Sequence, residues 1–221
     1  MHFHLPKPLH GWREFVGEVG IIVIGVLIAL AAQQIVETIH ERTEVDQLRQ
    51  SLRAELADSR ARWENMRSAD RCAVRRLDAL DHWLATAPPN ATLQRAYPLF
   101  LWSMHSSAWE IARSNPAISE LPLRERLTYA SLYAAIDNFR GYFDIQRANV
   151  VQLSGLFATA NQPENRRQIP LLLYKVRADL RLRQGNYPYF FDRFDELRIG
   201  SDRSELTVSV DSNRLCGPLG G

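Results

Sequence analysis

An unbroken apolar stretch lies near the start of an otherwise charged chain. Every residue from 19 to 32 is apolar, Gly or Ala. A helix needs about 20 such residues to cross a hydrocarbon layer of ~30 Å, and the segment 17–36 meets that length. A helix in the core of a soluble protein normally keeps a polar face, and residues 19–32 have none. The pattern therefore predicts a transmembrane helix over residues 17–36.

A cleaved signal peptide and a buried core helix are the alternatives to this anchor. The sequence Ala-Leu-Ala at 29–31 resembles a cleavage site, and Lys7 and Arg13 place positive charge before the apolar stretch. However, this charged region is long for a signal peptide, and it also contains Glu14 and Glu18. The helical pattern continues past residue 32 without a break. We therefore favour a retained anchor.

Residues 1–16 are expected to form a leader at the membrane interface. Trp12 and Phe15 can place aromatic rings at the depth of the lipid headgroups, with the cation of Arg13 beside lipid phosphate. Glu18 stands at the entrance of the predicted helix, where a carboxylate complements the positive N-terminal end of the helix dipole.

Small residues recur on one side of the predicted transmembrane helix. Gly25, Ala29 and Ala32 are four and then three positions apart, which places them on one face. In lipid, such a face allows close approach of a second helix, so these residues are candidates for a helix contact.

Basic residues on the two sides of the span are almost balanced. A short basic leader still favours a cytoplasmic N-terminus, which in a bacterium puts the C-terminal domain in the periplasm.

Residues 37–86 contain neither Pro nor Gly and predict one long amphipathic helix or stalk. Its length of about 75 Å exceeds what one small bundle can cover, so part of it is expected to pack elsewhere. Asp70 interrupts the apolar stripe. Apolar residues recur at steps of three and four on one face: Val45, Leu48, Leu52, Leu56, Trp63, Met66, Ala73, Leu77, Leu80 and Leu84.

Residues 87–200 are expected to complete an approximately four-helix bundle. In the third helix, Gln146 is a polar gap in the apolar stripe. We expect a polar loop at 161–167 and a helix end at Gly185. The predicted helices run from about Leu93 or Pro98 to Arg113, from Pro122 to Phe157, and from about Pro170 to Gln184. Residues 201–221 read as an irregular tail in which 205–210 could form a short strand. The predicted fold class is therefore all-α.

The stretch "GEVGIIVIGVLIALAAQQIVE" resembles the opening of a family of uncharacterised bacterial single-pass membrane proteins. The middle of the chain is also similar to that family at Trp109, Ala112, Leu127 and Tyr133, although Asn115-Pro116 stands where many relatives have Gly. The resemblance implies an anchored helical domain and implies no reaction. The matching N-terminal positions are Gly17, Glu18, Ile24, Gly25, Leu27, Ile28, Ala29 and Leu30.

Composition narrows the class of protein further. A length of 221 residues with 46% hydrophobic residues suits one domain plus an anchor, and a net charge of +2 gives no indication of nucleic-acid binding. The two cysteines, Cys72 and Cys216, are too few and too far apart for a zinc site. In an oxidising compartment they could form a disulfide, and in the cytosol they would be buried thiols.

The usual catalytic and metal-binding motifs are missing from the sequence, so we predict no catalytic, cofactor or metal site. His105 lies between Ser103 and Ser106, with Glu110 about one turn further on. Residues on a single helix do not readily converge as nucleophile, base and orienting group, so this pattern is better read as a polar patch.

One aromatic cluster near the C-terminus has two interpretations. One set of residues, Tyr187, Tyr189, Phe190 and Phe191, could belong to the domain core or could form a partner surface.

Together these patterns predict a non-catalytic, membrane-anchored protein that acts through protein–protein contacts. It would be an accessory subunit of a larger inner-membrane complex or a homo-oligomer, with the lipid bilayer and other membrane subunits or itself as partners. The alternative is a periplasmic ligand-binding or sensory module.

Overall fold

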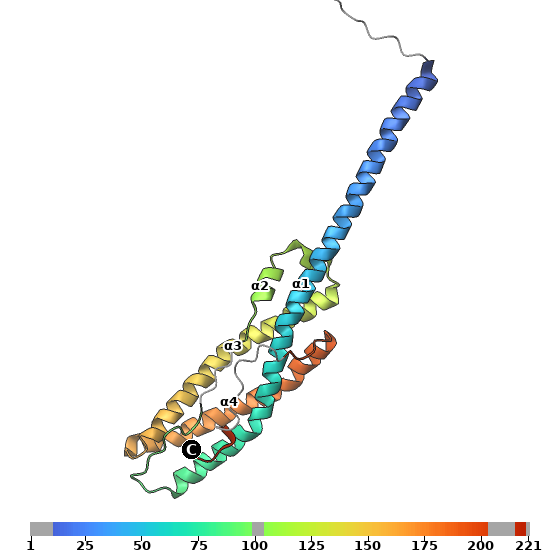
Figure 1. Cartoon of the computed structure of the whole chain (residues 1–221). Coiled ribbons are helices and arrows are strands. Elements are labelled where there is room, and N and C mark those ends of the chain that lie inside the picture. The colour runs from blue at the N-terminus through green and yellow to red at the C-terminus, as the bar shows by residue number, and fades with distance from the viewer. Residues whose placement is uncertain (1–10, 99–103, 203–214, 220–221) are drawn as a thin grey trace, which may run out of the picture. The chain divides into compact units, whose positions relative to one another are not determined.

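The computed structural model describes residues 11–98, 104–202 and 215–219 (Figure 1). Its regular elements are helices, which confirms the all-α prediction for the described part of the chain. The chain divides into two compact units, Met1–Gln47 and Leu48–Gly221. The elements are α1 (Gly11–Thr86), α2 (Ser107–Ala112), the 3₁₀ helix η1 (Pro116–Glu120), α3 (Leu123–Ala158) and α4 (Pro163–Glu196).

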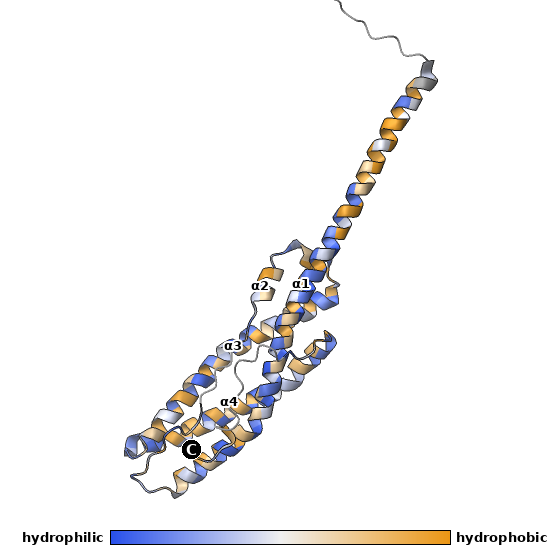
Figure 2. Cartoon of the chain, viewed as in Figure 1, coloured by the Kyte–Doolittle hydropathy of each residue, from blue (hydrophilic) through white to orange (hydrophobic). Residues whose placement is uncertain are grey.

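In the first unit, α1 carries an apolar segment that is long enough to cross a membrane, and none of it is buried by the described chain. Figure 2 shows how hydrophobic residues dominate this part of α1. Ile21, for example, is 74% exposed. The polar residues that follow make bonds within their own helix: the hydroxyls of Thr38 and Thr43 each donate to a carbonyl one turn earlier, at 2.8 Å.

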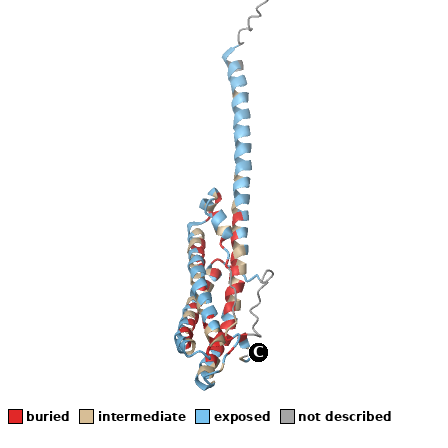
Figure 3. Cartoon of the chain, turned by 90° about the vertical axis from the view of Figure 1, so that its left-hand side faces the viewer, coloured by how far each residue is buried: buried red, intermediate tan, exposed pale blue. Residues whose placement is uncertain are grey.

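The second unit is built on three long helical segments, residues 48–86 of α1 together with α3 and α4. Figure 3 shows the buried residues along these segments. Each segment has an apolar face at helical spacing, and burying these faces against one another removes them from water. The predicted face of α1 is confirmed from Leu48 to Leu80 by its buried members: Leu48, Leu52, Leu56, Trp63, Met66, Ala73, Leu77 and Leu80.

Trp63 of α1 lies at the centre of an aromatic cluster that links the three long segments. Its side chain is fully buried. The indole stacks on Phe190 of α4, with ring centroids 4.0 Å apart. It also makes edge contacts with Phe139 of α3 at 5.2 Å and with Tyr187 of α4 at 5.7 Å. Rings in these geometries attract one another beyond their burial from water, so one residue ties all three helices together.

The predicted helix ending at Arg113 is much shorter than expected in the described residues, where α2 covers only Ser107–Ala112. The chain from Leu93 to Pro98 is irregular. It is held against α3 by non-helical bonds, from the Leu93 N–H to the Phe157 carbonyl at 2.9 Å and from the Ser154 hydroxyl to the Tyr97 carbonyl at 3.0 Å. The proline at 98 also disfavours helical geometry at the residue before it.

A carboxylate from α1 holds the start of α2. Glu55 accepts hydrogen bonds from the Ser107 hydroxyl at 2.7 Å and from the Ala108 N–H at 3.0 Å. Negative charge at a helix N-terminus satisfies free N–H groups and complements the helix dipole. This contact fixes the short helix to the bundle.

α4 is longer than predicted at both ends. It begins at Pro163 and ends at Glu196, so the expected loop at 161–167 and the expected end at Gly185 are both wrong. Pro163 suits the first turn of a helix, where its missing N–H has no partner to lose. The helix continues through Gly185 because buried side chains lie on both sides of that position, and tertiary packing outweighs the low helix propensity of glycine.

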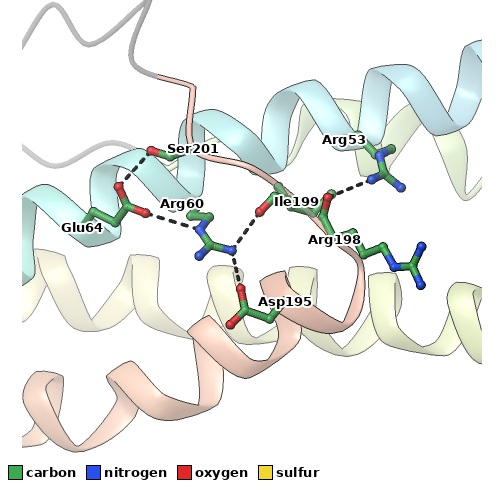
Figure 4. Close-up of polar contacts among 7 residues, drawn as sticks. All are labelled: Arg53, Arg60, Glu64, Asp195, Arg198, Ile199 and Ser201. Carbon is green, nitrogen blue, oxygen red and sulfur yellow. Dashed lines mark hydrogen bonds and ion pairs between the residues drawn. The ribbon is translucent and has the colours of Figure 1, made fainter.

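The chain leaving α4 runs back along α1 (Figure 4). The carbonyls of Arg198 and Ile199 accept hydrogen bonds from Arg53 at 2.9 Å and from Arg60 at 2.8 Å. The Asp202 N–H then donates to a carbonyl of α1, that of Ala57, at 3.1 Å. Residues 198–202 therefore form a strap fastened to α1 by its own hydrogen bonds. The predicted strand at 205–210 lies outside the described residues.

We expect the substitution Trp63→Ala to lower the free energy of unfolding of the bundle by about 3–5 kcal/mol, because it leaves a large cavity between three helices. Thermal denaturation of the full chain in mild detergent, followed by circular dichroism, measures this loss. Leu171→Ala is the control, since Leu171 is 59% exposed and its truncation should change the free energy by no more than about 0.5 kcal/mol. Similar losses for the two variants would contradict the central role of Trp63.

Candidate functional site

The predicted interface residues all lie on the first turns of α1. Trp12 and Phe15 are exposed, and their ring centroids are 5.9 Å apart. Glu18 is exposed as well. The side chain of Arg13 lies outside the described residues. An exposed aromatic pair at the start of an apolar helix is the arrangement that membrane interfaces accommodate.

The small residues of the apolar segment are open on all sides within the described chain. Gly25, Ala29 and Ala32 are exposed, and a Cβ added at Gly25 would meet no atom within 4 Å. The helical geometry of α1 places the three on one face. A neighbouring helix could therefore approach this face closely.

A buried ion pair joins α1 to α4 in the second unit. Asp70 is 3% exposed and Arg183 is 6% exposed. The Arg183 Nη2 group donates to Asp70 Oδ1, and the Tyr187 hydroxyl donates to Asp70 Oδ2 at 2.7 Å. The Arg183 Nη1 group donates to the Gln146 side chain of α3 at 2.9 Å. One polar cluster therefore contacts all three long segments.

The protonation states of Arg183 and Tyr187 suit their hydrogen bonds to Asp70. Burial is the largest single influence on the pKa of Arg183 and lowers it, but the charge and hydrogen bond of Asp70 together with Tyr187 and Tyr97 outweigh burial, so the pKa is raised. The guanidinium therefore stays charged. Burial raises the pKa of Tyr187, so its hydroxyl stays protonated and can donate to Asp70.

A cavity of about 50 Å³ lies beside the ion pair. Asp70, Arg183, Gln146 and Tyr97 contribute to its lining, and Leu215 of the C-terminal tail also borders it. This space suits a few water molecules or one small polar group, and it is well below the size of a pocket for a drug-sized ligand. The Nε atom of Arg183 is buried and has no hydrogen-bond partner among the described residues. Burial raises the pKa of Tyr97 to about 12, so that side chain is neutral near pH 7.

The two cysteines lie together at the edge of the same region. Cys72 and Cys216 form a disulfide with a Cα–Cα distance of 4.9 Å across a sequence separation of 144 residues. The next turn of α1 carries Arg76, which is 6% exposed. Its Nη1 group donates to the carbonyls of Gly217 at 3.0 Å and Pro218 at 2.9 Å. The disulfide and Arg76 together attach the tail to the bundle.

Sequence reasoning located part of this cluster. Asp70 and Gln146 each interrupt an apolar stripe, and the structure brings both interruptions to Arg183. The missing signal was Arg183 itself, because an arginine in an Arg-rich helix looks like an exposed residue. Its spacing from Leu180 and Tyr187, three and four positions away on the buried face, could have identified it.

The aromatic residues near the C-terminus divide between core and surface. Tyr187 and Phe190 are buried and therefore do not form a partner surface, because both contact Trp63. Tyr189 is 39% exposed. Phe191 is partly covered by the guanidinium of Arg67, at 5.4 Å from the ring centroid.

The described residues of the polar patch around His105 point to separate partners. The Ser106 hydroxyl accepts a hydrogen bond from Arg140 at 2.9 Å, and His105 is exposed. Ser103 lies outside the described residues. In the part of the chain that the structure describes, no three His, Cys, Asp or Glu side chains are grouped so that they could hold a metal ion.

Comparisons with known proteins gave no match to a family model, to a curated protein or to a solved structure.

We expect Asp70→Asn to lower the free energy of unfolding by about 3–5 kcal/mol, because it leaves the Arg183 guanidinium buried without a counter-charge. The matched control is Asp78→Asn, which breaks an ion pair between α1 and α4. In this pair Asp78 contacts Arg177, and the side chain of Asp78 is 60% exposed. That change should lower the free energy by no more than about 1 kcal/mol. Thermal denaturation in mild detergent measures both. Equal losses would show that burial of the first pair has no energetic consequence.

Proposed function

We propose that this chain is a non-catalytic, single-pass membrane protein that acts through protein–protein contacts, as an accessory subunit of a larger inner-membrane complex or as a homo-oligomer. The observation that carries the proposal is the exposed apolar segment of α1 near the N-terminus. A helix that is apolar on every side needs an apolar solvent, and a lipid bilayer supplies one. Membership of the uncharacterised bacterial single-pass family that the sequence resembles is part of this proposal.

The disulfide supports a particular orientation in the membrane. Bonds such as Cys72–Cys216 persist in oxidising compartments and are rare in the bacterial cytosol. We therefore assign the bundle to the periplasm, the short N-terminus to the cytoplasm and the span to the inner membrane. The short basic leader before the span favours the same orientation.

Two features support contacts with other proteins. The face made by Gly25, Ala29 and Ala32 suits close helix packing within the bilayer. In the bundle, α4 also exposes large apolar side chains at helical spacing, with Leu171 at 59% and Tyr174 at 68%. No catalytic role is proposed, because the buried groups Asp70, Arg183 and Tyr187 bond to one another.

A periplasmic ligand-binding or sensory module is the second candidate. The cavity beside Asp70 and Arg183 favours it, because the buried Nε of Arg183 could donate to a small polar ligand. Native mass spectrometry of the chain purified from its own membranes tests this alternative. A retained small molecule that Arg183→Lys loses would favour ligand binding over a purely structural cluster.

We expect the chain extracted with mild detergent to migrate in blue-native electrophoresis as an assembly larger than its monomer. The double substitution Gly25→Leu/Ala29→Leu should weaken that assembly about tenfold or more, because bulky side chains keep helix backbones apart. Val23→Leu/Leu27→Ile changes the opposite face and is the matched control. Mass spectrometry of the assembly distinguishes a homo-oligomer from a subunit of a larger complex. Migration of the wild-type chain as a monomer would contradict the proposed function.

A further inference from the structure

The two cysteines of the disulfide lie in different environments. Cys72, on α1, is 7% exposed and belongs to the hydrophobic core cluster, whereas Cys216 is exposed. Thiol–disulfide exchange requires an incoming thiolate to reach one of the two sulfurs. Solvent gives access to Cys216, while the packed core around α1 covers Cys72.

A cation stands beside the buried sulfur. The guanidinium of Arg75, three residues after Cys72 on α1, donates from Nη2 to Cys72 Sγ at 3.2 Å. Positive charge at this distance stabilises a thiolate relative to the thiol. A sulfur that is more stable as a thiolate leaves faster when its disulfide is attacked. Access and charge therefore assign different roles to the two cysteines.

We propose that Cys72–Cys216 is a thiol–disulfide exchange site for a dithiol reductant, with Cys216 as the attacked sulfur and Cys72 as the leaving thiolate. One thiolate of the dithiol bonds to Cys216 while the Cys72–Cys216 bond breaks and its electron pair stays on Cys72. The second thiolate of the reductant then attacks the reductant's own sulfur in the mixed disulfide. This step forms the reductant's internal disulfide and releases Cys216 as a thiolate. The dithiol is oxidised to a disulfide by two electrons, and its two protons end on the two cysteines.

Reduction leaves the described part of the tail, residues 215–219, attached by non-covalent contacts. Leu215 is 3% exposed within the core cluster, and Arg76 donates to the Gly217 and Pro218 carbonyls. The remaining Arg76 bonds go to the Ala96 carbonyl at 2.8 Å and the Arg95 carbonyl at 3.2 Å. Within the described residues, the hydrogen bonds of Arg76 therefore all go to backbone carbonyl oxygens. Without the covalent link, water can replace the tail carbonyls around this guanidinium.

Release of the tail would open the cavity. Leu215 lines the cavity that Asp70 and Arg183 also line, so its departure gives solvent access to the buried ion pair. The strap at 198–202 should stay in place, because the Asp202 N–H is bonded to α1 independently of the disulfide. We therefore expect the response to reduction in residues 215–219 and in 95–97, whose carbonyls share Arg76 with the tail, and not in the strap. The disulfide and its described neighbours all belong to one chain, so the response to reduction does not require that the chain forms oligomers.

The attacked sulfur can be identified on the wild-type chain. The oxidised full chain in mild detergent is exposed to a limiting amount of reduced glutathione, a monothiol that forms the first mixed disulfide and lacks the second thiol of a dithiol. Acid quenching and peptide mass spectrometry then locate the adduct. We expect glutathione on Cys216. An adduct on Cys72, or none on either cysteine, overturns the proposal.

The role of Arg75 is tested by the rate of reduction with dithiothreitol, followed by maleimide labelling of the released thiols. Arg75→Ala should slow reduction about threefold, since a leaving thiolate that has lost its neighbouring cation is less stable and leaves more slowly. Arg75→Lys should keep most of the rate, and Arg71→Ala, an exposed arginine one turn earlier, should keep all of it. An unchanged rate in Arg75→Ala contradicts the assigned leaving group.

Release of the tail is measured by hydrogen exchange in the wild-type chain before and after reduction. We expect amides of residues 215–217, of residue 219 and of 95–97 to exchange at least tenfold faster after reduction, while those of 48–64 are unchanged. Unchanged protection of 215–219 would show that the tail stays bound without the disulfide, and would overturn the proposed consequence of reduction.

Discussion

No described part of the chain covers the apolar side chains of residues 19–32, which is compatible with a membrane anchor. Each buried CH₂ group contributes about 0.8 kcal/mol on leaving water, so exposure of this run of Ile, Val and Leu to water is unfavourable. In lipid, the same run also satisfies its own backbone, because every interior N–H and C=O bonds within the helix. The proposed anchor, orientation and lipid-facing helix contacts all depend on lipid surrounding this segment.

Beyond the anchor, the bundle combines a non-directional and a directional interaction. Burial of apolar faces brings α3, α4 and residues 48–86 of α1 together, and Trp63 is their common contact. The Asp70–Arg183 pair then restricts how these helices align, because a buried charge is tolerated only with its partner in place. A disulfide between Cys72 and Cys216 adds the tail to this arrangement. Core, ion pair and tail therefore meet around a single small cavity.

The sequence was sufficient where one local pattern decided the outcome. The apolar segment and the buried face of α1 follow directly from spacing, and the polar gaps at Asp70 and Gln146 mark the buried cluster. Prediction was wrong where distant contacts outweighed local propensity. α4 passes through Gly185 because packing on both sides holds it, and the chain near Pro98 is irregular because α3 supplies its hydrogen bonds. Arg183 was missed because the sequence does not show which arginine among many has a buried partner.

The central claim is that lipid surrounds the apolar segment of α1, and spin labels placed on that segment test it most directly. A label at position 21, 24 or 28 of the full chain, reconstituted in bilayers, reports its collisions with oxygen, which concentrates in lipid, and with a water-soluble nickel complex. The account predicts high oxygen access and low nickel access at all three positions, and the reverse at position 41. High nickel access at 21, 24 and 28 would show that water surrounds the segment and would contradict the account.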